Sequence, residues 1–213
     1  VYNFGDADWE DSAMPWNFLL GKLRFRLDVP GNLMQVATNY GVHQNRDVFT
    51  QELALTPAQA ETLAARLREL DSDAERWYPH DYIDAICTTR VRDLLDEVLD
   101  GAIREQLEGK PDGRSIRSYQ RQAFDGKALA GLGTDLLLGR ENDVELDQWR
   151  ASFEPSRMRE HFATVQVADP KGGGGRVPLI ASPTQVAGRS GPSPIQGQTF
   201  GSWWFVVLGL AAL

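Results

Sequence analysis

The hydrophobic period of the chain changes along its length, and this change constrains the fold more than any other feature. Leu23, Phe25 and Leu27 alternate with charged residues, as in a strand with one buried face. From residue 87 to about residue 107, apolar residues instead recur every three or four positions, which predicts one long amphipathic helix. Strand-like and helix-like stretches do not alternate regularly, so we expect an α+β fold rather than a doubly wound sheet.

Local signals predict further elements. Residues 48–55 form a second extended candidate. Thr56, Pro57 and Gln59 then stand at the N-cap, the first helical position and the capping-box position of a helix.

Two more helical features lie later in the chain. Residues 155–162 predict a short helix. On the helix that begins near residue 87, Arg92 and Asp96 have the spacing of an exposed ion pair.

Charge and composition divide the chain near residue 170. The first part, residues 1–169, carries 30 acidic and 19 basic residues and is expected to be the folded domain. Residues 170–200 are rich in Gly and Pro, which predicts a linker in which only residues 177–180 look able to pack.

Residues 201–213 form an apolar run that contains no charge and opens with paired Trp. It is shorter than the roughly 20 residues of a spanning helix. Because it is cut off by the end of the sequence, and because Val1 opens inside a strand-like run, we expect a fragment of a longer protein. Residues 201–213 would then be the start of a transmembrane helix; the alternative is a terminal element that docks on the domain.

The composition excludes several classes of function. A formal net charge of -8 argues against nucleic-acid binding, which needs Lys and Arg to neutralise phosphates. Cys87 is the single cysteine, so no disulfide or Cys-x-x-Cys zinc site can form within the chain. The acidic cluster of residues 6–11 lacks the spacing of a calcium loop. We therefore expect neither a metal nor a cofactor.

Cys87 carries the one arrangement that suggests chemistry. It stands where a polar and aromatic loop leads into the predicted helix, and the positive end of a helix favours the thiolate, which is the nucleophilic form. The alternative is a small buried hydrophobic residue. A nucleophile also needs a base, and the candidates are His43, His80 and His161.

Several short motifs occur in an order that resembles one known family. They are Val1-Tyr2-Asn3-Phe4-Gly5, Asn17-Phe18, Gly21-Lys22-Leu23, Arg46-Asp47-Val48, residues 51–56, Cys87-Thr88-Thr89-Arg90-Val91-Arg92-Asp93, residues 135–139 with Asp143, and Phe153-Glu154-Pro155. This order resembles the N-terminal periplasmic domain of the bacterial lipoprotein N-acyltransferase Lnb family.

The resemblance implies a permuted papain-like, NlpC-type thiol fold, here incomplete at its N-terminus, in which Cys87 is the nucleophile. Its partner His would precede residue 1. The family usually has Asn before this Cys, whereas Ile86 stands here and cannot help to position an oxyanion. Arg90 and Asp93 match the family pattern, as substrate contacts or as an ion pair or cap at the helix start. Together with Tyr82 and Asp84 they are the candidate site-shaping residues.

The implied function is a membrane-attached acyltransferase that moves an acyl chain from a phospholipid or other acyl donor to the N-terminus of a lipoprotein. Its location would be the bacterial inner membrane, with the domain on the periplasmic side. Two alternatives stay open: a cysteine peptidase or amidase of the envelope, and a catalytically inactive, membrane-tethered binding domain.

Overall fold

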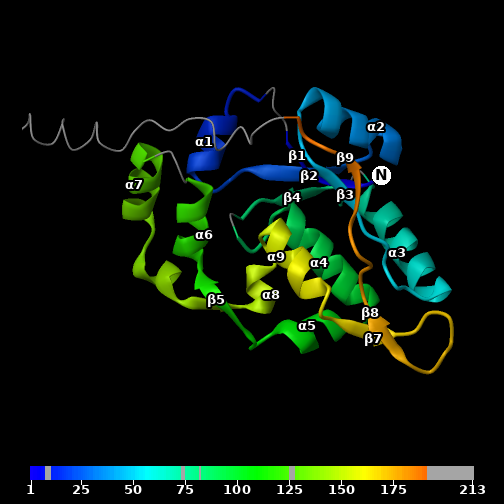
Figure 1. Ribbon diagram of the computed structural model, residues 1–213. Coiled ribbons are helices and arrows are strands. Elements are labelled where there is room, and N and C mark those ends of the chain that lie inside the picture. Colours follow the sequence, from blue (N-terminus) through cyan, green and yellow to red (C-terminus); the bar gives the residue numbers. More distant parts are fainter. Residues whose placement is uncertain (8–10, 73–74, 82, 125–127, 191–213) are drawn as a thin grey trace, which may run out of the picture. The chain divides into compact units, whose positions relative to one another are not determined.

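The computed structural model describes residues 1–7, 11–72, 75–81, 83–124 and 128–190, and it contains both helices and strands (Figure 1). The predicted α+β class is confirmed. The strands are β1 (Asn3–Ala7), β2 (Arg24–Asp28), β3 (Val48–Thr50), β4 (Trp77–Pro79), β5 (Pro111–Ser115), β6 (Glu145–Asp147), β7 (Gln166–Ala168), β8 (Arg176–Pro178) and β9 (Thr184–Ala187). The α-helices are α1 (Met14–Leu19), α2 (Leu33–Thr38), α3 (Pro57–Leu70), α4 (Cys87–Val98), α5 (Ala102–Leu107), α6 (Ile116–Ala123), α7 (Ala128–Leu137), α8 (Gln148–Ala151) and α9 (Pro155–Phe162). A π-helical turn, η1 (Asn39–His43), and a 3-10 turn, η2 (Arg140–Asp143), complete the described elements.

The chain forms two compact units. Unit 1 comprises Val1–Lys110 and Asp147–Gly188, and the described part of unit 2 is residues 111–124, 128–146 and 189–190.

A three-stranded antiparallel sheet in unit 1 has the order β1-β2-β4, and these strands lie side by side in Figure 1. Phe4 pairs with Leu27, and Phe25 pairs with Tyr78. The register between β1 and β2 shifts between Phe4 and Asp6, which makes a β-bulge around Gly5. Helix α4 packs on β1 at this place.

The hydrophobic core of unit 1 joins α4 and α5 to the later helices α8 and α9 and to the segment around β7 and β8. Its buried members are Leu95, Leu99, Ile103, Leu107, Trp149, Phe162, Val165, Val167, Leu179 and Ile180. This core fixes α4, so the first residue of α4 has a rigid support.

Two of the predicted helices are confirmed, one of them from its capping signals. Helix α3 begins at Pro57 with Thr56 as its N-cap, and Gln59 completes the capping box. Helix α9 spans the predicted residues 155–162, with the carboxylate of Glu154 accepting from the amide of Arg157.

The single long helix predicted from residue 87 to about residue 107 is wrong, because the structure divides it into α4 and α5. Asp100 and Gly101 between them have positive φ angles of 53° and 82°, which end the first helix. The carboxylate of Asp96 accepts hydrogen bonds from the amides of Ile103 and Arg104, at 3.0 and 2.9 Å, and so caps the start of α5.

The predicted surface pair between Arg92 and Asp96 is also wrong. Arg92 is only 7% exposed; its guanidinium donates to the carbonyl oxygen of Trp149 at 2.9 Å and stacks 4.0 Å from that ring. Its ion-pair partner is the neighbouring Asp93, at 2.7 Å. A contact with a residue 57 positions away therefore replaces the local pair.

Part of the Gly- and Pro-rich segment packs in unit 1. Strand β8 pairs with β7, and β9 pairs with β3. Leu179 and Ile180, from the stretch that looked able to pack, are buried in the core. Residues 201–213, the predicted start of a transmembrane helix, lie outside the described residues. Within the described ranges no helix has the length and apolar character needed to cross a bilayer.

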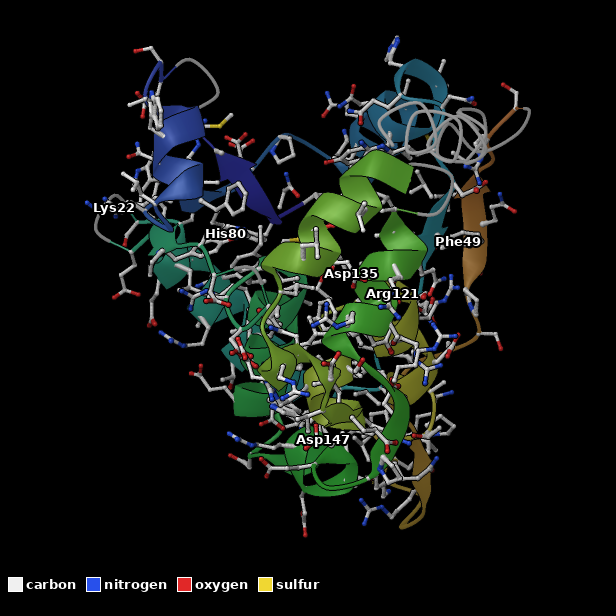
Figure 2. All side chains as sticks on the ribbon, turned by 90° about the vertical axis from the view of Figure 1, so that its left-hand side faces the viewer. Lys22, Phe49, His80, Arg121, Asp135 and Asp147 are labelled. Atoms are coloured by element: carbon white, nitrogen blue, oxygen red, sulfur yellow. The ribbon has the colours of Figure 1, made fainter. Side chains whose placement is uncertain are left out.

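Unit 2 contains β5, β6, α6, α7 and η2. Ion pairs of Arg117 and Arg121 connect its segments. Arg117 donates to the carboxylate of Asp135 at 2.9 Å and forms an ion pair with Asp143. Arg121 adds a second ion pair with Asp135 at 2.8 Å, and Figure 2 shows these two side chains beside each other.

Candidate active site

Cys87 is the first residue of α4, as the loop-to-helix pattern predicted, and the preceding loop is tied to the first helical turn by Thr89. The hydroxyl oxygen of this fully buried residue accepts from the amide of Ile86 at 2.9 Å. Its hydrogen faces the carbonyl oxygens of Ile86 and Asp84, at 3.0 and 3.2 Å. These bonds fix the position of Cys87 relative to the chain that leads to it.

The N-terminus of α4 leaves backbone donors available beside the thiol. Ile86 is the N-cap residue and has no polar side chain to accept from the helix amides. Within the described residues, the amides of Cys87, Thr88 and Thr89 donate to no acceptor. These N–H groups and the positive end of the helix create an environment that favours negative charge.

The thiol is exposed and lies against a glycine of β1. Cys87 is exposed, and its Sγ lies 3.9 Å from the hydroxyl oxygen of Thr88, as a weak hydrogen bond. Gly5, with φ +112°, faces it so closely that a Cβ built on Gly5 would lie 3.0 Å from the Cβ of Cys87. The exposed position argues against the alternative of a buried core thiol.

Tyr78 lies within electrostatic range of this cysteine and of Arg90, one helical turn along α4. Tyr78, on β4, is only 6% exposed, and within the described residues its hydroxyl has no hydrogen-bond partner. The guanidinium carbon of Arg90 lies 4.5 Å from the centre of its ring. Burial raises the pKa of Tyr78, and the negative charge of the nearby Cys87 thiolate raises it further, while Arg90 opposes the rise. Tyr78 therefore stays protonated near neutral pH.

The described contacts of Cys87 include none of the three candidate histidines. His80 packs edge-on against Phe25, with ring centroids 4.4 Å apart, and burial lowers its pKa despite the opposing effects of the Ala85 backbone and Asp81. His43 is exposed at the end of η1, and His161 is buried on α9. The identity of the base stays a prediction.

The remaining predicted site residues are distributed around the start of α4. Asp84 is exposed and lies 3.9 Å from Arg150. Asp93 pairs with Arg92, not with Arg90. Tyr82 lies outside the described residues. Sequence reasoning gave no role to Gly5, Tyr78 or Thr89, although Gly5 and Thr89 lie in the motifs that carry the resemblance.

A cleft of about 400 Å³ opens beside Tyr78 and Arg90 in unit 1. Its walls come from β1, β2, α3, β4 and α4, and both apolar and charged side chains line it. Within the described residues, no three His, Cys, Asp or Glu side chains come together as metal ligands.

Comparison with family models gives one assignment: the Lnb N-terminal periplasmic domain matches residues 6–121, which include Cys87, Tyr78 and Arg90. The chain belongs to the Lnb N-terminal periplasmic domain family. No curated protein and no solved structure matches it.

Membership of the Lnb family indicates a periplasmic domain of a cell-envelope protein. The match contains β2, α3, β4, α4 and α5 in full, so it includes two of the three strands of the sheet and the helix that begins at Cys87.

Proposed function

We propose that this Lnb-family chain is the thiol-enzyme domain of a membrane-attached acyltransferase that uses Cys87 as its nucleophile. The observation that carries the proposal is the position of an exposed thiol at the first residue of α4, locked by Thr89 and held against Gly5. A cysteine in such a position combines accessibility with an electropositive surrounding, which are the two requirements of a reactive thiol.

The proposed reaction has two balanced steps. The sulfur of Cys87 attacks the carbonyl carbon of an ester in the acyl donor, a C–S bond forms, the ester C–O bond breaks, and the departing alcohol takes the proton released by the thiol. The terminal amine of a lipoprotein then attacks the thioester carbon. The C–S bond breaks, an amide forms, and the sulfur regains a proton from the amine.

The backbone amides at the start of α4, which have no acceptor among the described residues, are the donors available to the oxyanion that forms in each step. They donate the hydrogen bonds to the oxyanion that the side chain of Ile86 cannot donate. We further propose a permuted papain-like arrangement, in which the base is a histidine that precedes residue 1 in the complete protein. The acyl donor would be a phospholipid or another acylated lipid, at the periplasmic side of the inner membrane.

Replacing Cys87 by Ala in the complete protein tests the proposal. Acylation of lipoprotein N-termini, followed by mass spectrometry in cells that depend on this protein, should be abolished. The exposed residue Thr62 on α3 offers a control, since Thr62→Ala should leave acylation intact. Unchanged acylation in Cys87→Ala would contradict the proposal.

One observation favours a second candidate function. No histidine is among the described contacts of Cys87, and this fits an inactive, membrane-tethered binding domain. The Cys87→Ala variant distinguishes the two functions, because a binding domain would keep its function after this replacement.

A further inference from the structure

The cleft beside Tyr78 lies within unit 1 and has a mixed lining. Apolar side chains from β1, β2, α3, β4 and α4 line it together with charged side chains. The lining residues are Phe4, Leu27, Arg66, Leu70, Glu75, Arg76, Trp77, Tyr78, Pro79, Arg90, Asp93, Leu94 and Glu97. A volume of about 400 Å³ falls in the range of small-molecule sites.

Most charges in the cleft are already neutralised by protein partners. Arg66 forms ion pairs with Glu69 and, at 2.8 Å, with Glu97. Arg76 pairs with Asp71 at 3.3 Å. Asp93 forms an ion pair with Arg92, which does not line the cleft.

Arg90 is the exception among the cations of the lining. It makes no ion pair within the described part of the chain, and its buried Nε donates to no acceptor there. Stacking on Tyr78 at 4.5 Å fixes the plane of its guanidinium. A guanidinium that is already oriented loses little freedom when it binds an anion, so Arg90 is prepared for one.

Tyr78 adds a second donor at the same place. Tyr78 lines the cleft together with Arg90, and its buried hydroxyl lacks a partner within the described residues. A buried polar group without a partner has a free-energy cost, which a ligand oxygen would remove.

The apolar and the charged lining residues together define the ligand. A fully polar ligand would leave the apolar surface of Phe4, Leu27, Leu70 and Leu94 uncovered, and a fully apolar one would bury Arg90 without a counter-charge. We infer that the cleft binds an anionic amphiphile, whose single aliphatic chain contacts these apolar side chains and whose carboxylate or phosphate head meets Arg90 and Tyr78.

This site is distinct from Cys87, which does not line the cleft, but it is close to it. Arg90 follows Cys87 by one helical turn on α4, and Tyr78 lies within electrostatic range of both. The inference concerns binding and goes beyond the proposed acyl transfer, since it would hold if Cys87 had no catalytic role.

Calorimetric titration of the folded chain with dodecanoate, kept below its micelle concentration, tests the inference. Saturable binding is expected, whereas dodecanol and acetate should each bind at least about tenfold more weakly, because each lacks one of the two contacts. Titration with dodecyl phosphate and with inorganic phosphate separates a lipid-like ligand from a free anion. Equal binding of inorganic phosphate and dodecyl phosphate would overturn the role of the aliphatic chain.

Arg90→Met tests the head-group contact and should weaken dodecanoate binding by about tenfold to a hundredfold, as for a hydrogen bond to a charged group. Arg68→Met is the matched control, because Arg68 is exposed on α3 and lies outside the cleft. If Arg90→Met does not fold, Arg90→Lys and Tyr78→Phe test the same head-group contact, with smaller losses of dodecanoate affinity. Unchanged binding in these variants would overturn the inference.

Replacing Glu75, the remaining carboxylate of the lining, by Gln should strengthen binding of the anion, and a weakening would overturn the charge argument. Cys87→Ala should retain dodecanoate binding. Loss of acylation with retained binding therefore tests the proposed function separately from this inference.

Discussion

Gly5→Ala is expected to disturb the candidate site, because Gly5 on β1 lies against Cys87. The glycine has φ +112°, which side chains of L-residues rarely adopt, and this backbone strain should cost about 1–3 kcal/mol. The new methyl group would also lie 3.0 Å from the Cβ of Cys87. Overpacking of this kind costs about 1–3 kcal/mol. The two effects together predict a loss of at least about 2 kcal/mol and a displaced thiol.

Urea unfolding and the rate of Cys87 alkylation by iodoacetamide measure the two effects. Gly101→Ala is the matched control, since Gly101 has φ +82° with no heavy atom near its missing Cβ, and only the backbone cost of about 1–2 kcal/mol is expected. Gly101→Ala should leave alkylation unchanged, whereas Gly5→Ala should alter its rate. An equal loss of stability in both variants, with equal alkylation rates, would refute the reasoning.

Two further predictions concern the anchor of the site and the stability of unit 2. Thr89→Val keeps the shape of the side chain but leaves the Ile86 amide without its acceptor, so urea unfolding should show a loss of about 1–3 kcal/mol; a loss below about 0.5 kcal/mol would contradict the anchoring role. The pKa of Asp135 is lowered to about 2, first by Arg121 and then by Arg117. Because the folded value lies below the unfolded value of about 3.9, the carboxylate stabilises unit 2 above pH 4, and this contribution is lost as the pH falls towards 2. Stability measured against pH should show a weaker acid dependence in Asp135→Asn, and an unchanged dependence would contradict the ion-pair account.

Elements specified by neighbouring residues could be predicted from the sequence. The N-cap Thr56 and the capping residue Gln59 define the start of α3. These signals are short in range, so the rest of the fold does not need to be known. The position of Cys87 at a helix start follows from another local pattern, the change from a polar and aromatic loop to helical spacing.

Features that depend on tertiary contacts could not be predicted. The apolar spacing after residue 87 continues across Asp100 and Gly101, so periodicity alone hides the break that their positive φ angles cause. Arg92 has the spacing of a surface pair, yet it is buried on Trp149 from a distant helix. Strand β9, in the segment expected to be a linker, pairs with β3, which lies far away in the sequence.

The candidate site likewise has one part that the local sequence predicts and one part that depends on tertiary contacts. Its nucleophile stands in a recognisable local pattern, whereas its surroundings come from strand pairing. Gly5 lies against Cys87, and Tyr78 lies within electrostatic range of it, in a sheet where β1 and β4 flank β2, and the local sequence does not predict that arrangement.

A mass measurement of the Cys87 peptide tests the central claim most directly. The complete protein would be incubated with its acyl donor in the absence of acceptor, then digested and analysed. The account predicts an acyl adduct on Cys87 that neutral hydroxylamine removes, as expected of a thioester, and that is absent in Cys87→Ala. Transfer of acyl chains to lipoproteins by the Cys87→Ala variant, with no adduct on the natural protein, would contradict it.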